Sequence, residues 1–304
     1  MKREYSLAHL TVLSLTPPQL VDVAARTGYD FVGVRMTRVT PDEVLYPLAT
    51  DRALRKETKA RLGDTGVRIH DIELMRMDPA LDADHFLPCL EAGADLGARH
   101  AIAQLPDPDR ERATARFARL CDLAKPLGIF VSLEFPHWTE IGNLADAARV
   151  VAAVNRANAG ILVDMLHFGR SDSSLEELEK LPREWFRFAH VCDAAKEVPP
   201  TMDGIIHTAR DERLFPGEGG IAVREILARM PPGIPYALEI PRVTLTRAVG
   251  PEEVARLALL VAKSYLEGMD DPVRAPARRA GAAEMAGAAE MAGAQRAAHP
   301  ALHP

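Results

Sequence analysis

The sequence contains little cysteine, with three cysteines among 304 residues. Cys89, Cys121 and Cys192 are odd in number and widely spaced, and no two of them form a CxxC pair. This pattern argues against a disulfide framework, which needs paired cysteines, and against a cysteine-based zinc site, which needs close spacing. Unpaired cysteines are typical of a reducing compartment, so we expect a cytoplasmic protein.

The sequence also lacks an excess of positive charge and any long apolar run. Its formal net charge is -6, which argues against general nucleic-acid binding, because contacts to phosphates need a basic face. No apolar run approaches the length of a membrane span. The opening residues, MKREYSLAHL, contain no apolar segment of the kind that secretion signals have. We therefore expect a small-molecule partner, with neither nucleic acid nor a membrane.

Composition divides the chain into two parts. With 47% hydrophobic and 26% charged residues, the chain as a whole is typical of globular proteins. After about Asp271 the sequence repeats AGAAEM and contains almost no large apolar residue except Met. Such a segment cannot bury a core, so we expect one domain over residues 1–271 and a disordered tail over 272–304. His299 and His303 lie in that tail and are poor site candidates.

Short apolar runs alternate with helical patterns along the first part. Most of the runs have no polar face, as expected of parallel strands that are covered on both sides. We expect strands at residues 5–13, 29–36, 67–75, 100–105, 129–135, 159–165, 185–193 and 236–241. Eight such units predict a closed (β/α)8 barrel, a TIM barrel. The first strand–helix turn contains no GxGxxG, which disfavours the rival fold, a doubly wound open sheet.

Helix boundaries can be predicted from capping residues. The first helix should begin after Thr16, with Gln19 completing a capping box, and should end at Gly28. A second helix is expected from Asp51 to Leu62, where Gly63 would end it. Other helices are expected near residues 83–96, 109–128, 144–157, after Gly220, and over 251–268, with a long loop after the seventh strand.

Polar side chains follow four successive strands of the predicted barrel at their carboxyl ends, where barrel active sites gather. They are Glu134, then Asp164 and His167, then His190 and Asp193, then Glu239. A single acid after a strand is usually a helix cap, and a lone His in an apolar run is usually a core residue with its hydrogen bonds satisfied. Four successive strands with such ends favour a shared site. Two Glu, one Asp and one His suit Mn²⁺, Mg²⁺ or Co²⁺, and Zn²⁺ stays open.

Five segments, VSLEF, ILVDMLHF, AHVCDA, RLFPGEGGI and YALEIP, resemble the xylose isomerase-like barrels that include sugar phosphate isomerases and epimerases. The resemblance covers residues 5–267. It implies that Glu134, Asp164, His190 and Glu239 are the metal ligands and that His167 contacts the substrate. Related lyases, the 3-dehydroshikimate and inosose dehydratases, share this pattern, although some of them have Gln where this chain has His190. Related nucleases have additional His ligands that this chain does not show.

The resemblance implies a reaction that begins with removal of a proton beside a carbonyl. A divalent metal would stabilise the negative charge that develops on oxygen as a Lewis acid. Glu134 and Glu239 would serve as the acid–base pair besides binding the metal. We therefore expect a metal-dependent sugar (phosphate) isomerase or epimerase. A dehydratase begins in the same way and stays the alternative, and a non-enzymatic metabolite-binding barrel is disfavoured because the ligand set is complete.

Several residues around the expected mouth are further candidates for substrate binding. Arg210 and Arg213, in the loop after the seventh strand, would bind a carboxylate or a phosphate. Trp138 would form an apolar wall, and Glu73 lies at a strand end that faces the mouth. His9, Arg35 and Gln104 occupy the corresponding ends of other strands, whereas His137 has no counterpart in the family. A homodimer formed through helices outside the mouth is left open.

Overall fold

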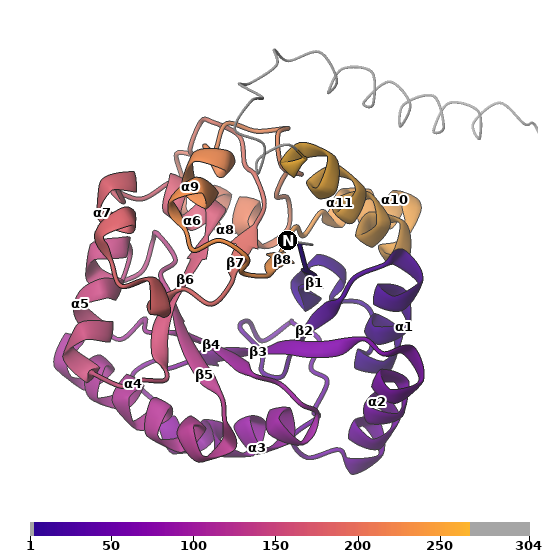
Figure 1. The fold of residues 1–304 in the computed structure, drawn as a ribbon, viewed down its shortest axis with the longest axis horizontal. Helices are drawn as coiled ribbons and strands as arrows, with labels where there is room; N and C mark the ends of the chain where they lie inside the picture. Colours follow the sequence, from indigo (N-terminus) through magenta and orange to yellow (C-terminus); the bar gives the residue numbers. More distant parts are fainter. Residues whose placement is uncertain (1–2, 268–304) are drawn as a thin grey trace, which may run out of the picture. The chain divides into compact units, whose positions relative to one another are not determined.

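Eight parallel strands close into a barrel in chain order, with β8 hydrogen-bonded to β1 (Figure 1). The computed structural model describes residues 3–267. Its strands are β1 (Tyr5–Leu7), β2 (Phe31–Arg35), β3 (Arg68–Arg76), β4 (His100–Gln104), β5 (Phe130–Glu134), β6 (Ala159–Asp164), β7 (Ala189–Val191) and β8 (Tyr236–Leu238). The predicted TIM barrel is confirmed. The predicted tail, with its two histidines, lies outside the described residues.

Helices surround the barrel on the outside (Figure 1). They are α1 (Pro17–Thr27), α2 (Arg52–Thr65), α3 (Leu87–Asp95), α4 (Arg110–Ala124), α5 (Leu144–Val154), α6 (Met165–Gly169), α7 (Leu175–Lys180), α8 (Met202–Arg210), α9 (Val223–Arg229), α10 (Val243–Val249) and α11 (Pro251–Leu266). Four short 3-10 helices are η1 (His9–Val12), η2 (Ala83–Phe86), η3 (Lys125–Leu127) and η4 (Arg183–Trp185). Among the described helices, none combines the length and apolar character that crossing a bilayer requires.

The capping signals place one helix correctly and misplace the end of another. α1 has the expected capping box, in which the backbone N–H of Thr16 donates to the Gln19 side chain at 2.9 Å, and Gly28 ends it with φ +90°. The predicted end of α2 at Gly63 is wrong, because the helix continues to Thr65 and Gly66 ends it with φ +75°. A helix tolerates an internal glycine at a cost of about 1 kcal/mol.

Two apolar runs are longer than the strands they contain. The run at residues 185–193 has only the three residues of β7 in the sheet, although Phe186 and Phe188 before it are buried. The run at residues 5–13 likewise divides into β1 and η1. The predicted long loop after β7 contains the helix α8. Apolar runs report burial, and they do not show which buried residues pair in a sheet.

An apolar layer fills the inside of the barrel directly below the predicted site. Its residues are Leu74, Ile102, Leu162, Phe188 and Ala237. Side chains two residues apart on a strand point to the same side. The positions two residues after four members of this layer are therefore aligned above it, and they are Gln104, Asp164, His190 and Glu239. The packed core thus determines where the polar side chains at the strand ends lie.

Replacement of Gly160 in β6 tests this close packing. A Cβ there would overlap the carbonyl oxygen of Trp185 and lie 2.6 Å from the Phe130 ring, so we expect Gly160→Ala to lower the free energy of unfolding by about 1–3 kcal/mol. Gly63→Ala is the control, because nothing lies within 4 Å of that position, and it should gain about 0.5–1 kcal/mol of helix stability. Urea unfolding measures both, and equal effects would contradict the packing.

Candidate metal centre

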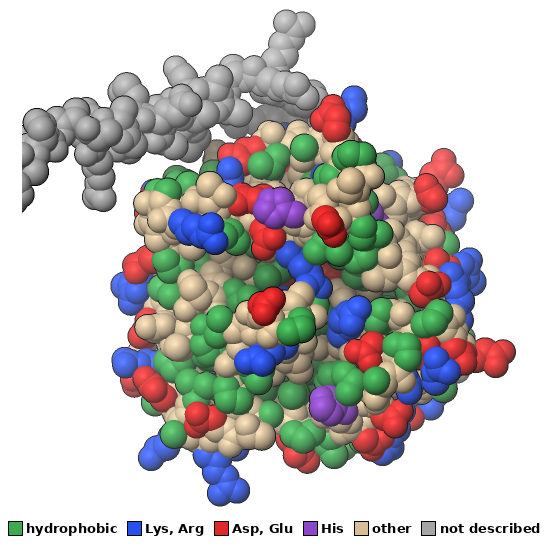
Figure 2. Space-filling model, turned by 180° about the vertical axis from the view of Figure 1, so that it is seen from behind, with side chains coloured by type: hydrophobic (Ala, Val, Ile, Leu, Met, Phe, Trp, Pro, Cys, Tyr) green, Lys and Arg blue, Asp and Glu red, His purple; other side chains and the backbone are tan. Residues whose placement is uncertain are grey.

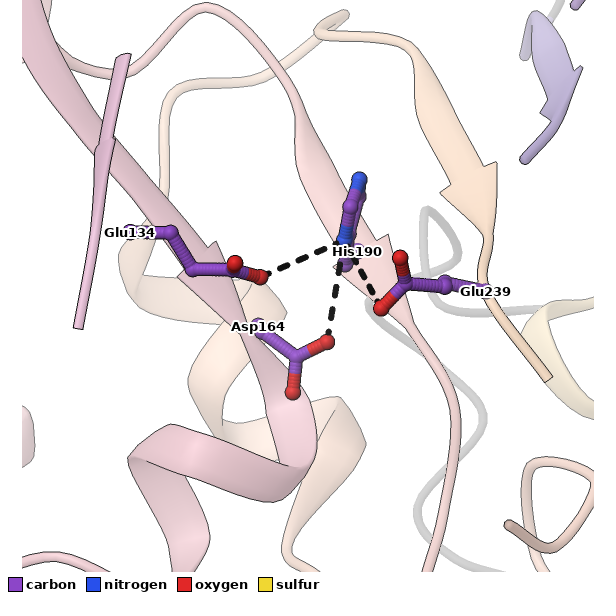
Figure 3. A group of neighbouring side chains, drawn as sticks. All are labelled: Glu134, Asp164, His190 and Glu239. Carbon is purple, nitrogen blue, oxygen red and sulfur yellow. Dashed lines mark ion pairs between the residues drawn. The ribbon is translucent and has the colours of Figure 1, made fainter. Parts of the chain in front are cut away.

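Four side chains from β5, β6, β7 and the end of β8 converge at one point (Figure 3). Glu134, Asp164, His190 and Glu239 each offer one ligand atom, and these atoms all lie within 4.8 Å of one another. All four residues are buried. Asp164 and His190 are direct neighbours in the sheet register. The structure therefore brings together the complete predicted ligand set.

His190 lies between the three carboxylates. Its Nδ1 is 3.3 Å from Glu239 Oε2, 3.6 Å from Glu134 Oε1 and 3.7 Å from Asp164 Oδ2. Burial lowers the pKa of His190, but the negative charges of Glu239 and Glu134 outweigh this effect and raise it well above its usual value. Within the described residues, neither ring nitrogen has a hydrogen-bond partner of good geometry.

These residues fit a divalent cation. Three carboxylates and one imidazole form an oxygen-rich donor set of the kind that Mn²⁺, Mg²⁺, Co²⁺ or Zn²⁺ accepts. Three acids buried so close together repel one another unless a positive charge lies between them. The buried His190 nitrogens have no hydrogen-bond partner among the described residues, and metal coordination would occupy one of them.

Arg213 supplies part of the positive charge at this point. Its Nη1 lies 2.6 Å from Asp164 Oδ2, and its Nη2 lies 2.8 Å from Glu239 Oε2. Its Nε donates to the carbonyl oxygen of Ala209 at 2.7 Å. Burial lowers the pKa of Arg213, but the two carboxylates outweigh it and hold that pKa well above its usual value. Arg213 is therefore a buried partner of two candidate ligands, whereas the sequence predicts a loop arginine that binds a substrate carboxylate or phosphate.

Asp164 has two different partners for its two oxygens. Oδ1 accepts the backbone N–H of His167 at 3.0 Å and caps α6, while Oδ2 faces Arg213 and His190. The two interpretations of such an acid, a helix cap and a metal ligand, are therefore compatible in one side chain. Glu134 is held in a similar way, since Gln104 Nε2 donates to its Oε2 at 2.6 Å while Oε1 faces His190.

An open pocket lies beside these ligands, and we call it the mouth pocket. Its lining includes Glu73, Glu134, His167, Arg210, Arg213 and Glu239. All the predicted substrate-binding residues line this pocket, Trp138 among them. Arg35 and Gln104 line it as well. His9 lies outside the lining, because Arg35 donates its backbone N–H to His9 Nδ1, while Nε2 lies 2.8 Å from the Leu15 carbonyl oxygen.

His167 has two aromatic neighbours on one wall of the mouth pocket. The Trp138 ring meets it edge-on at 5.0 Å, and His137 Nδ1 lies 3.3 Å from its Nδ1. Burial lowers the pKa of His137 to about 3, so this imidazole is neutral near pH 7 and contributes a hydrogen bond. His137 is not among the predicted substrate-binding residues. Its position directly before Trp138, three residues after Glu134, was the available signal.

Glu73 and Glu43 bind Arg35 on the opposite side of the site. Arg35 Nη1 lies 3.1 Å from Glu43 Oε1, and its Nε lies 3.3 Å from Glu73 Oε1. Burial raises the pKa of Glu73 to about 7, with Arg35 opposing the rise and the charge of Glu239 adding to it. Glu73 is thus a mouth-pocket carboxyl that changes its charge near neutral pH.

Asp193, which also follows β7, has a structural role. Its two carboxylate oxygens accept backbone N–H groups from Ala194, Gly217, Gly219 and Ile221 at 2.8–3.0 Å. The PGEGG turn is therefore folded around this carboxylate. Gly217 has φ +93°, and a Cβ at Gly219 would overlap the backbone of Ala194. The glycines of the motif are needed for this close approach.

The arrangement defines a (β/α)8 barrel in which four residues that could hold a metal ion lie at the carboxyl ends of the strands. The family model described as the xylose isomerase-like TIM barrel matches residues 21–265. The chain belongs to this family, as the sequence motifs indicated.

Curated relatives match a part of this chain. An inosose isomerase of Bacillus licheniformis is 29% identical over 149 residues, which are 45% of this chain and 51% of the relative. An inosose isomerase of Bacillus velezensis is 23% identical over 227 residues, 67% of this chain and 74% of the relative. The match to the first of these spans about half of that relative's length.

Solved structures share the fold. The IOLI protein, whose crystal structure contains a bound zinc atom, has a TM-score of 0.70 and 19% identity, covering 87% of this chain and 99% of that one. At 19% identity the likeness establishes the barrel fold and no role of an individual residue.

Substitution of two candidate ligands tests the metal centre. Asp164→Asn and Glu239→Gln each replace a charged oxygen ligand by a neutral amide. We expect the wild-type protein to gain about 2.7 kcal/mol of stability at Mn²⁺ equal to 100 times its dissociation constant, and both variants to lose most of this gain. Thermal unfolding with and without chelator measures it. Glu252→Gln is the control, because Glu252 is exposed and pairs with Arg26. A full Mn²⁺ response in both ligand variants would contradict the assignment.

A pH series tests the environment of Glu73. The pKa of Glu73 is about 7 in the folded protein against 4.5 for the unperturbed group, so the folded state holds the proton more tightly. Measured relative to Glu73→Gln, the stability of the chelator-treated wild-type protein should therefore fall as pH rises from 4.5 to 7, by on the order of 3 kcal/mol, and this difference should stay constant above pH 7. Glu73→Gln should lack the fall, and the exposed Glu57→Gln should keep it. Parallel curves of stability against pH for all three proteins would contradict the raised pKa of Glu73.

Proposed function

We propose that the protein is a divalent-metal-dependent isomerase or epimerase that acts on a sugar or sugar-like ketone. The observation that carries this proposal is the convergence of Glu134, Asp164, His190 and Glu239 beside an open pocket. Family membership and the inosose isomerase relatives support the reaction class. A D-allulose 3-epimerase from Methylomonas sp. has the same fold, with a TM-score of 0.63 and 18% identity, covering 87% of this chain and 97% of that one.

The residues divide the proton-transfer chemistry among them. A bound divalent cation would act as a Lewis acid toward the carbonyl and a neighbouring hydroxyl oxygen of the substrate. Glu134 and Glu239 are the groups that remove and return the proton beside that carbonyl. Gln104 fixes Glu134 by one oxygen and Arg213 fixes Glu239, so both carboxylates are held in place before substrate arrives.

His167 and Trp138 orient the substrate. His167 lines the mouth pocket and is held by its backbone hydrogen bond to Asp164 and by its contact with His137. Its imidazole is available to hydrogen-bond a substrate oxygen. Trp138 contributes an apolar surface beside it, which suits the carbon face of a sugar.

Product analysis tests the proposal. Chelator-treated protein is loaded in turn with Mn²⁺, Mg²⁺, Co²⁺ and Zn²⁺ and supplied with ketoses, inososes and 3-dehydroshikimate. We expect a product of unchanged mass that chromatography separates from its substrate. This product should be absent with chelator and in Glu239→Gln, and it should be retained in Glu252→Gln. A product lighter by one water would show a dehydratase instead. The absence of any metal-dependent product across the panel would contradict both enzyme classes.

A further inference from the structure

The mouth pocket contains one arginine without a partner. Arg210, the last residue of α8, is half-buried and lines the pocket. Over residues 3–267 its guanidinium group makes no ion pair and no hydrogen bond. Two acids are near enough to act on it, Glu43 and Asp211. Both have other partners.

Those partners account for the nearby negative charge. Glu43 Oε1 pairs with Arg35 at 3.1 Å, and its Oε2 accepts the backbone N–H of Val39 at 3.0 Å. Asp211 Oδ2 lies 2.9 Å from His207 Nδ1. Arg210 is therefore a cation whose neighbouring acids are already engaged.

The charges of the metal centre balance without Arg210. Two positive charges of a divalent cation, together with Arg213, match the three carboxylates Glu134, Asp164 and Glu239. Arg210 lines the same pocket but is not needed for this charge balance, and Arg76 lines the pocket as well. The only ion pair of Arg76 among the described residues is a loose one with Asp78, at 3.8 Å between partly exposed groups.

The cationic side chains act on one another. Burial lowers the pKa of Arg210, and the positive charges of Arg35 and Arg76 lower it further. Basic side chains lie near the middle of the face shown in Figure 2. An unpaired arginine beside other arginines in a concave site is favourable only when an anion neutralises it.

We propose that Arg210, aided by Arg76, binds an anionic group of the substrate, a carboxylate or a phosphate, away from the metal centre. This inference rests on the proposed function and narrows its substrate class to anionic sugars or sugar-derived keto acids. A neutral sugar in the mouth pocket would leave the positive charge of Arg210 without a counter-ion.

Three ketoses that differ only at C6 test the inference: D-fructose, D-fructuronate and D-fructose 6-phosphate. Calorimetric titration into the full-length, Mn²⁺-loaded protein at constant ionic strength gives each dissociation constant. We expect one anionic probe to bind at least about 10-fold more tightly than D-fructose, and Arg210→Gln to weaken it about 10- to 100-fold. The anionic probe that binds more tightly shows whether the site prefers a carboxylate or a phosphate. Arg210→Gln should change D-fructose binding by less than about 2-fold.

A control variant makes the outcome decisive. Arg52→Gln removes an exposed arginine outside the mouth pocket and should keep the preference for the anion. Equal binding of all three probes, or an anion preference that survives in Arg210→Gln, would overturn the inference, since a surviving preference means that another group than Arg210 binds the anion. Isomer formation from the same probes is scored separately. Anion preference with no metal-dependent product from these probes or from the panel above contradicts the proposed function alone, whereas turnover of D-fructose without anion preference contradicts this inference alone.

Discussion

Repulsion between three buried carboxylates is the constraint on which the site depends. Glu134, Asp164 and Glu239 lie close together at the mouth of the barrel, where little water screens them. Arg213 holds two of these acids directly, and His190 stands between all three. A divalent cation at the same point would complete the balance. A metal bound there would therefore stabilise the folded protein, because the same charges would govern binding and stability.

The fold imposes that constraint through its strand geometry. Each of four positions in the apolar layer inside the barrel is followed, two residues later, by a polar side chain of the site. The pleat of the strand sends both to the same side. The packed apolar layer holds in place the strand ends that carry the polar side chains. The positions of these side chains are therefore fixed before any metal or substrate is bound.

The sequence predicts the elements that depend on local patterns. Apolar runs predict all eight strands, and acids at their ends predict the ligand cluster, because parallel strands finish at one rim. Arg213 lies between α8 and α9, and its bond to Asp164 at the end of β6, 49 residues away, follows no periodic pattern. The sequence predicts a loop where α8 lies, and β7 is shorter than its apolar run. Such features depend on tertiary contacts that one sequence does not display.

The most direct test of the metal centre is anomalous diffraction from crystals grown with Mn²⁺. The account predicts one strong peak within about 2.0–2.5 Å of an oxygen of Glu134, Asp164 and Glu239 and of His190 Nδ1. A peak elsewhere, with Arg213 still bridging Asp164 and Glu239 and the cluster free of metal, would contradict it.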